Sequence, residues 1–295
     1  MTSTSKTVVF FGTDNFSAQS LNRLIEDGFS IAAVITKPDS PQGRGRKLTP
    51  PAVKIIAEQH DITVWQPERL LDIADNIRAL DSPIGVLVSY GKIIPQSIID
   101  LFSPGIVNVH PSLLPKYRGP SPIETTILNG DEETGVSIMQ LSAAMDAGPV
   151  YDQTTVSLSG RESSPELEEI LGGIGAKRLS EILPTIISGD LQPKPQDDSK
   201  ATYCRLLKKS DAQLDPAKFT AAEAERRIRA HLAFPKTKLT VLGQPIIVQK
   251  AQVVEHPTSE IDVACKGGSY LRIEKLIGPS GREMTAGDFL RGYKK

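Results

Sequence analysis

The sequence predicts an α/β protein built on a doubly wound parallel sheet, followed by a small β-rich domain. Three observations predict this fold class. The chain begins with two apolar runs that flank an amphipathic helical stretch. Short apolar runs then alternate with helical stretches as far as residue 188. Beyond residue 200, closely spaced strand-like runs separated by Gly or Pro replace the long helical stretches.

The first strand–helix–strand unit accounts for residues 6–35. Residues 6–11 form an apolar run that ends at Gly12, which indicates a buried strand. Asp14 can cap a helix that continues to about Gly28, and residues 31–35 form the second strand. Because a helix joins the two strands, we expect them to be parallel. The same patterns predict strands at 62–65, 84–88, 106–109 and 136–141, and helices at 51–60, 70–80 and 161–188.

The second domain follows a polar segment that contains two prolines, Gly189–Asp198, which is typical of a linker. We expect a first domain over residues 1–188, a linker over 189–207 and a second domain over 208–295. Within the second domain a short helix is predicted at 221–230. Strand-like runs at 238–242, 246–254, 261–265 and 270–276 have the spacing of a small β-barrel or sandwich.

Charge is distributed unevenly along the 295 residues, although the net charge is only −1. Residues 1–199 hold 16 Lys and Arg against 25 Asp and Glu, a net charge of −9. Residues 200–295 hold 18 against 10, a net charge of +8. A basic C-terminal third favours a module that faces a polyanion, and ordinary solvated surface is the alternative.

Composition excludes several classes of protein. Hydrophobic residues make up 39% and charged residues 23% of the chain, which is typical of a globular protein. Two cysteines cannot build a disulfide framework, and no run approaches the roughly 18 apolar residues of a membrane span. The first residues lack the apolar core of a secretory signal, so we expect a cytoplasmic protein without a membrane partner.

Common cofactor and nucleophile motifs are missing from the sequence. No GxGxxG follows the first strand, so a nicotinamide-dependent oxidoreductase is disfavoured. No Walker A sequence and no GxSxG nucleophile motif occur. The four histidines lie far apart without ligand spacing, so we expect no metal site.

The informative stretch is residues 106–122. An apolar strand carries Asn108 and His110 two positions apart, so both side chains lie on one face at its carboxyl end. Prolines and a glycine then hold a loop, in which Arg118 can bind a carboxylate or the loop backbone. Downstream, Asp146 lies in a turn of small residues. Taken alone, these three residues are better explained as a structural Asn, a His with its hydrogen bonds satisfied and a turn Asp.

The whole pattern resembles the 10-formyltetrahydrofolate-dependent formyltransferases, in particular the members that act on methionyl-tRNA. The resemblance runs nearly end to end. Its most specific motifs are Asn108-Val-His110, the sequence Ser112-Leu-Leu-Pro115, and Asp146-Ala-Gly148. The other matching stretches are 11–13, 37–48, 89–95, 118–119, 129–135 and 284–292.

This resemblance implies a Rossmann-like formyltransferase domain followed by an OB-like small β-barrel. It implies that Asn108, His110 and Asp146 form the catalytic group, which stabilises an oxyanion and moves a proton as an amine attacks a formyl carbon. It places the folate co-substrate near a set drawn from the Ser-Leu-Leu-Pro loop and a neighbouring strand end: Ser112, Leu113, Leu114, Pro115, Val86, Val88 and Tyr90.

The resemblance further implies contacts to initiator methionyl-tRNA from the basic loop 36–51 and from the C-terminal domain. The expected contacts in the loop are Lys37, Arg44, Arg46 and Lys47, and those in the C-terminal domain are Lys208 and Lys209, with Arg226, Arg227, Arg229, Lys236 and Lys238 as further candidates. Gly and Pro residues in the loop predict an irregular structure. We expect a monomer.

Two further functions remain open from the sequence. A formyltransferase that acts on an amino sugar nucleotide would share Asn108, His110 and Asp146, but the basic loop and the basic C-terminal third argue against it. A non-catalytic RNA-binding protein on the same scaffold would not need the intact Asn, His and Asp set.

Overall fold

The computed structural model describes residues 6–42, 45 and 47–293, which form two compact units. The first unit comprises the chain up to Pro120, Thr134–Val156 and Glu168–Tyr203. The second comprises Ser121–Glu133, Ser157–Leu167 and the residues from Cys204 onward. The second unit therefore includes two segments that precede residue 188 in the sequence.

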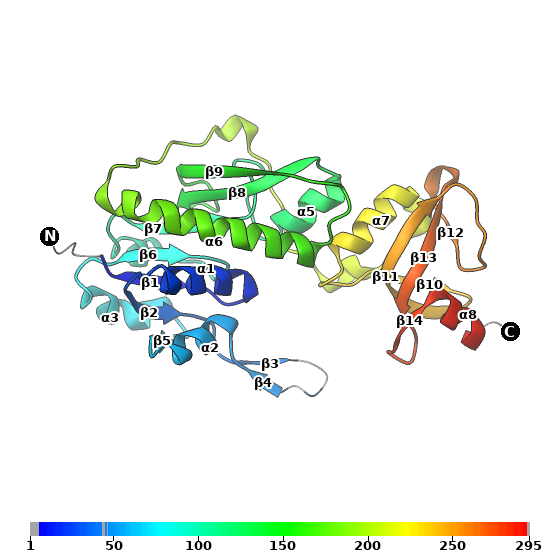
Figure 1. Ribbon diagram of the computed structural model, residues 1–295, viewed down its shortest axis with the longest axis horizontal. Helices are drawn as coiled ribbons and strands as arrows, with labels where there is room; N and C mark the ends of the chain where they lie inside the picture. Colours follow the sequence, from blue (N-terminus) through cyan, green and yellow to red (C-terminus); the bar gives the residue numbers. More distant parts are fainter. Residues whose placement is uncertain (1–5, 43–44, 46, 294–295) are drawn as a thin grey trace. The chain divides into compact units, whose positions relative to one another are not determined.

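A seven-stranded sheet with the order β5-β2-β1-β6-β7-β8-β9 forms the centre of the first unit (Figure 1). Its strands are β1 (Val8–Phe11), β2 (Ile31–Ile35), β5 (Thr63–Trp65), β6 (Ile84–Leu87), β7 (Ile106–His110), β8 (Glu133–Gln140) and β9 (Val150–Ser157). The expected parallel sheet is confirmed for β5 through β7. Strand β8 runs antiparallel to β7, and β9 extends the sheet where no strand was predicted.

The helices of this unit include those predicted near 14–28, 51–60, 70–80 and 161–188, together with one at Gln96–Ile99 that was not predicted. They are α1 (Asn15–Glu26), α2 (Ala52–Gln59), α3 (Ala74–Arg78), α4 (Gln96–Ile99) and α6 (Ser164–Ser188), with a 3₁₀ turn at Leu70–Ile73 before α3. Asp14 caps α1, because its carboxylate accepts a hydrogen bond from the Ser17 amide at 3.1 Å. Helices α1 and α6 pack together where Gly172 leaves room for the Gln19 side chain (Figure 1).

The described residues of the segment 36–51 include the two strands of a short β-hairpin, whereas the Gly and Pro content of the segment predicts an irregular loop. Strand β3 (Ser40–Gln42) pairs antiparallel with β4 (Lys47–Thr49). The base of the hairpin is held by Lys54, whose ammonium donates to both carboxylate oxygens of Asp39 at 2.9 and 3.0 Å. The Gln66 amide donates to Asp39 and to the Lys37 carbonyl, both at 2.8 Å. Proline is tolerated here because β3 is an edge strand.

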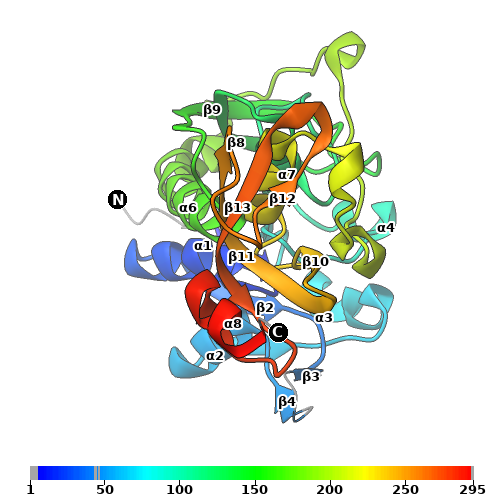
Figure 2. The same cartoon turned by 90° about the vertical axis from the view of Figure 1, so that its right-hand side faces the viewer.

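The second unit contains a curved antiparallel sheet of the kind expected for an OB-like domain (Figures 1 and 2). Its strand order is β10-β11-β13-β12, with β14 paired to β13. The elements are α5 (Pro122–Asn129), α7 (Ala221–Ala230), β10 (Lys238–Val241), β11 (Gln244–Val254), β12 (Val263–Ala264), β13 (Tyr270–Ile277), β14 (Glu283–Thr285) and α8 (Ala286–Tyr293). The predicted helix at 221–230 is confirmed, whereas β14 and α8 were not predicted.

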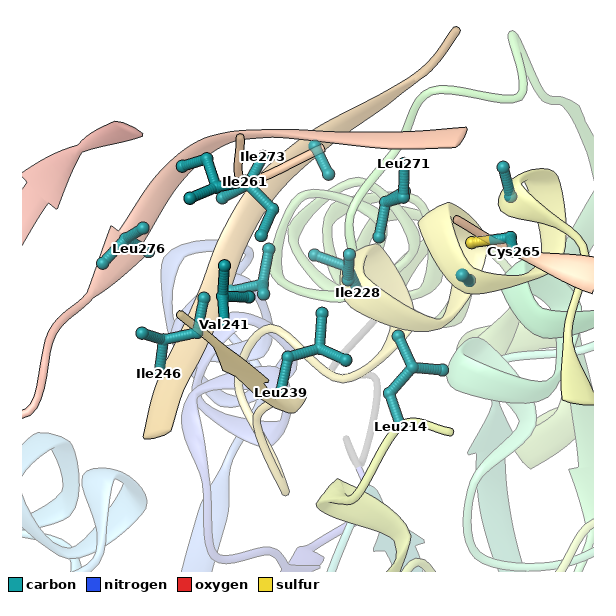
Figure 3. Close-up of a cluster of buried hydrophobic side chains, with 14 of the residues drawn as sticks. Leu214, Ile228, Leu239, Val241, Ile246, Ile261, Cys265, Leu271, Ile273 and Leu276 are labelled. Carbon is teal, nitrogen blue, oxygen red and sulfur yellow. The ribbon is translucent and has the colours of Figure 1, made fainter. Parts of the chain in front are cut away.

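The core of the second unit lies between α7 and the sheet (Figure 3). Ile228 of α7 packs with Leu239, Leu271 and Ile273 of the strands, and all four are at most 4% exposed. Burial of such side chains provides roughly 1.5–3 kcal/mol each. This unit therefore has a hydrophobic core of its own.

Candidate active site

Strand β7 presents two of the predicted catalytic residues at one edge of the sheet. Val109 faces α6, where a Cβ added to Gly175 would lie 2.7 Å from Val109 Cγ1. Because side chains alternate along a strand, Asn108 and His110 point to the opposite face. Both are 5% exposed, and His110 ends the strand. They lie at the carboxyl edge of the parallel strands, where open α/β sheets bind ligands.

The proline-containing loop after β7 is held by the two strands that follow it. The Ser112 hydroxyl donates to the Lys116 carbonyl at 2.6 Å, which closes the loop on itself. The Ser137 hydroxyl of β8 donates to the Ser112 carbonyl at 2.6 Å and accepts from the Leu114 amide at 3.0 Å. The Gln153 amide of β9 donates to the Leu114 carbonyl at 2.9 Å. Strands β8 and β9 therefore fix the loop beside His110.

His110 lies between this loop and Asp146. Its Nε2 is 3.0 Å from the Tyr117 carbonyl oxygen, and its Nδ1 is 3.8 Å from Asp146 Oδ2. Because a carbonyl only accepts, Nε2 carries a proton in this ring orientation and donates it. The same Asp146 oxygen accepts from the Gly119 amide at 2.8 Å. Nδ1 is therefore the ring nitrogen that faces the carboxylate.

Asp146 has a backbone conformation that few residues adopt. Its φ is +49°, in the left-handed region that costs a non-glycine residue energy. Only glycine fits at the neighbouring position 148, because a Cβ on Gly148 would lie 1.9 Å from the Gln140 carbonyl oxygen. The turn between β8 and β9 thus requires a glycine in order to place Asp146 opposite His110.

Gln196 connects the two loops of the site, although the sequence places it in a linker. Its amide donates to the carbonyl oxygens of Asp146 at 2.8 Å and Gly148 at 2.6 Å. Its Oε1 accepts from Arg118 Nε at 3.0 Å and from a terminal nitrogen of the same guanidinium at 2.8 Å. Arg118 is 2% exposed and also bonds the Asp198 carboxylate at 2.6 Å. Arg118 therefore binds a carboxylate, which is one of the two roles expected for it, and it is connected to the 146–148 turn through Gln196.

The residues expected near the folate fall into two groups. Ser112, Leu113, Leu114 and Pro115 lie in the loop beside His110. Val86, Val88 and Tyr90 are at most 1% exposed, so they offer mainly their backbone to a ligand. The Tyr90 ring packs edge-on against Phe11, and burial raises the pKa of Tyr90 to about 12. Its carbonyl oxygen accepts from the Thr13 hydroxyl at 3.0 Å.

The residues expected to contact transfer RNA are mostly exposed where the structure describes them. Arg44 and Arg46 lie outside the described residues. Lys47, Lys208 and Lys209 are exposed, and Lys37 is half-buried beside Gly91. Arg226 donates to the Leu128 carbonyl at 3.2 Å, and Arg229 donates to the Glu162 carbonyl at 2.7 Å. These two arginines have partners within the second unit.

Comparison with known proteins follows the same division of the chain. Residues 5–183 match the formyl transferase family, and residues 206–294 match the formyl transferase C-terminal domain. A methionyl-tRNA formyltransferase of Halorhodospira halophila is 40% identical over 97% of this chain and 96% of its own length. One from Methylococcus capsulatus is 38% identical over the same shares of the two chains.

A solved structure with a similar fold is an N-formyltransferase from Helicobacter canadensis in complex with folinic acid and dTDP-3-aminofucose. It is 19% identical, with a TM-score of 0.70 over 91% of this chain and 98% of its own. At this identity the likeness concerns the fold alone, whereas the relatives at about 40% identity cover nearly all of both chains. The chain therefore belongs to the formyl transferase family and, within it, to the family of the methionyl-tRNA formyltransferases.

Proposed function

We propose that this protein transfers the formyl group of 10-formyltetrahydrofolate to the free amino group of initiator methionyl-tRNA. The observation that carries the proposal is that His110 faces Asp146 at 3.8 Å, at the carboxyl end of the strand that carries Asn108 on the same face. The relatives at about 40% identity, which are named methionyl-tRNA formyltransferases, support the acceptor. Solved structures of sugar N-formyltransferases share the fold with this chain, but they are no more than 19% identical to it and so give the sugar-directed alternative little support.

The reaction needs charge stabilisation and one proton transfer. The amine nitrogen attacks the formyl carbon, and the carbonyl oxygen becomes an oxyanion. The new C–N bond remains when the bond from the formyl carbon to folate N10 breaks. A proton leaves the attacking nitrogen and, in net terms, N10 gains one. No covalent link to the protein is formed in this sequence of steps.

The three side chains suit these requirements. The Asn108 amide group can donate to the oxyanion from a site where its side chain is almost fully shielded from water. His110 holds Nε2–H on the Tyr117 carbonyl, so we assign proton exchange to Nδ1. The Asp146 carboxylate faces Nδ1 at 3.8 Å and can stabilise the imidazolium or receive the amine proton.

The remaining roles are assigned as follows. The loop Ser112–Pro115 and the strand end at Val86, Val88 and Tyr90 bind the folate, the latter through the backbone. Residues 1–188 form the catalytic domain, 189–207 the linker and 208–295 the domain that binds transfer RNA. Lys37, Arg44, Arg46, Lys47, Lys208 and Lys209 contact the phosphate backbone or base edges of the acceptor. A monomeric state and a cytoplasmic location stay predictions. Among the described residues, no helix has the length and hydropathy of a membrane span.

The test is a transfer assay with two acceptors. Purified protein is incubated with 10-formyltetrahydrofolate and either charged initiator methionyl-tRNA or a nucleotide-linked amino sugar, and formylated product is followed over time. We expect formylation of the methionyl amine. Transfer to the sugar alone would overturn the proposed acceptor, and transfer to neither would overturn the proposed reaction.

A further inference from the structure

Tyr203 is an exposed aromatic side chain fastened to the loop of the active site. It is 68% exposed, so most of its surface is accessible to a ligand. Its hydroxyl accepts from Arg118 at 3.4 Å, and its backbone forms an isolated parallel bridge with the same residue. The ring is therefore held at its backbone and at its tip while most of its surface remains open to solvent.

The strand-like segment that carries Tyr203 is part of the scaffold of the catalytic group. Thr202 bonds the loop three times, through the Pro115 carbonyl at 3.1 Å, the Tyr117 amide at 2.9 Å and the Arg118 amide at 2.9 Å. The Tyr117 carbonyl holds His110, and the Gly119 amide holds Asp146. Tyr203 is thus adjacent to the residues that position both catalytic side chains.

The proposed acceptor brings a planar base to this place. In a charged transfer RNA the amino acid is esterified to the ribose of the terminal adenosine, so adenine arrives at the site together with the reacting amine. Single-stranded nucleotides are commonly bound by stacking on exposed aromatic side chains. A ring that is fixed in position loses little further conformational freedom when a base stacks on it.

Resting on the proposed function, we propose that the Tyr203 ring is the stacking platform for the terminal adenine of methionyl-tRNA. The open ring binds the base, and the links to Arg118 fix its distance from His110 and Asp146. This assignment makes Tyr203 a residue that positions the acceptor amine. It also separates two roles of the side chain, because the ring stacks whereas the hydroxyl only braces.

The test uses methionyl-tRNA whose terminal adenine is replaced by 2-aminopurine, a base whose fluorescence falls when it stacks. Binding is followed independently by anisotropy of a dye at the 5′ end. With the unmodified protein we expect the fluorescence to fall on binding. Tyr203→Phe retains the fall, whereas Tyr203→Ala loses it and raises KM for methionyl-tRNA about tenfold, as expected for one base–aromatic stack.

The control is Leu206→Ala, which removes a similarly exposed apolar side chain, 65% exposed, from the following segment. It should leave both the fluorescence change and KM as in the unmodified protein. Retention of the fall by Tyr203→Ala would overturn the stacking role while the formyl transfer itself still stands. Absence of any binding or transfer by the unmodified protein would overturn the proposed function and this inference together.

Discussion

His110 is the residue on which the proposed chemistry depends most directly. Its Nε2 is bound to the Tyr117 carbonyl, which leaves Nδ1 facing Asp146. We expect His110→Ala to lower kcat by about 100-fold or more, the usual effect of removing an acid–base group. The dissociation constant of the folate co-substrate, measured by fluorescence titration, should change little. His60→Ala, at an exposed position, is the control, and unchanged turnover of His110→Ala would remove His110 from the chemistry.

Gln196 carries a second prediction at the same scale. Gln196→Ala removes one hydrogen bond from each of two carbonyl oxygens in the 146–148 turn. It also removes the hydrogen bonds that the buried Arg118 donates to the Gln196 side chain. We expect a loss of roughly 1–3 kcal/mol in the free energy of unfolding. Turnover should fall by about tenfold, because even small misplacements of catalytic groups are costly.

The comparison for Gln196 is Gln192→Ala, in the same segment. Gln192 is exposed, and its side chain donates to the Gly189 carbonyl at 2.7 Å. Denaturant unfolding and initial rates of both variants decide the matter. Equal behaviour of the two variants would mean that Gln196 does not support the site.

The contrast between His110 and Gln196 shows what the sequence can reveal at the residue scale. Asn108, His110 and Asp146 belong to motifs with fixed spacing, so the resemblance identifies them directly. Gln196 lies 50 residues from its partner Asp146 and acts through backbone carbonyls. Nothing in the local pattern around it signals a site, and its Pro-containing surroundings favour a linker. Such long-range contacts to the backbone become visible only with the fold.

At the scale of elements, the errors have a physical pattern of their own. Strand β9 reads Val-Tyr-Asp-Gln-Thr-Thr-Val-Ser, in which four consecutive polar residues interrupt the alternation of apolar and polar residues, and it is the last strand of the sheet. The β3–β4 hairpin contains Pro41 and follows a Lys-Pro-Asp sequence, which argues for an irregular loop. Its fixed base depends on Lys54 and Gln66, which come later in the chain. Edge strands are thus the elements that the hydrophobic pattern describes least well.

Helix α7 yields a prediction that concerns pH. His231, its C-terminal cap, is fully buried, and neither ring nitrogen has a hydrogen-bond partner among the described residues. Burial, aided by the nearby Arg227, lowers the pKa of His231 from 6.5 to about 4, and this outweighs the opposite effect of Asp211. The folded protein therefore holds His231 neutral at pH values where the unfolded chain already binds a proton.

The sign of the effect on stability follows from this difference. The contribution of neutral His231 to the free energy of unfolding is complete above pH 6.5. It is lost as the pH falls from 6.5 towards 4, because only the unfolded chain gains the proton in that range. The full loss amounts to about 3 kcal/mol. We expect His231→Phe to reduce the fall in unfolding free energy between pH 7 and pH 5, whereas His256→Phe, at an exposed position, should not. An identical pH profile for His231→Phe would mean that the pKa of His231 is the same in the folded and the unfolded protein.

At the scale of the whole molecule, charge is what the sequence describes best, because it needs no fold to be counted. The net charges of −9 over residues 1–199 and +8 over 200–295 predict that transfer RNA binds with a strong dependence on salt.

Each phosphate contact contributes roughly 0.7–0.9 to the slope of log K against log salt concentration. Lys208→Ala combined with Lys209→Ala should therefore reduce that slope by up to about 2. Arg78→Ala combined with Lys177→Ala removes the same charge from exposed positions in the acidic part and should leave the slope unchanged. The slopes are measured by anisotropy titrations at roughly 50–200 mM salt. Equal slopes for the two double variants would show that net charge, and not local contact, governs binding.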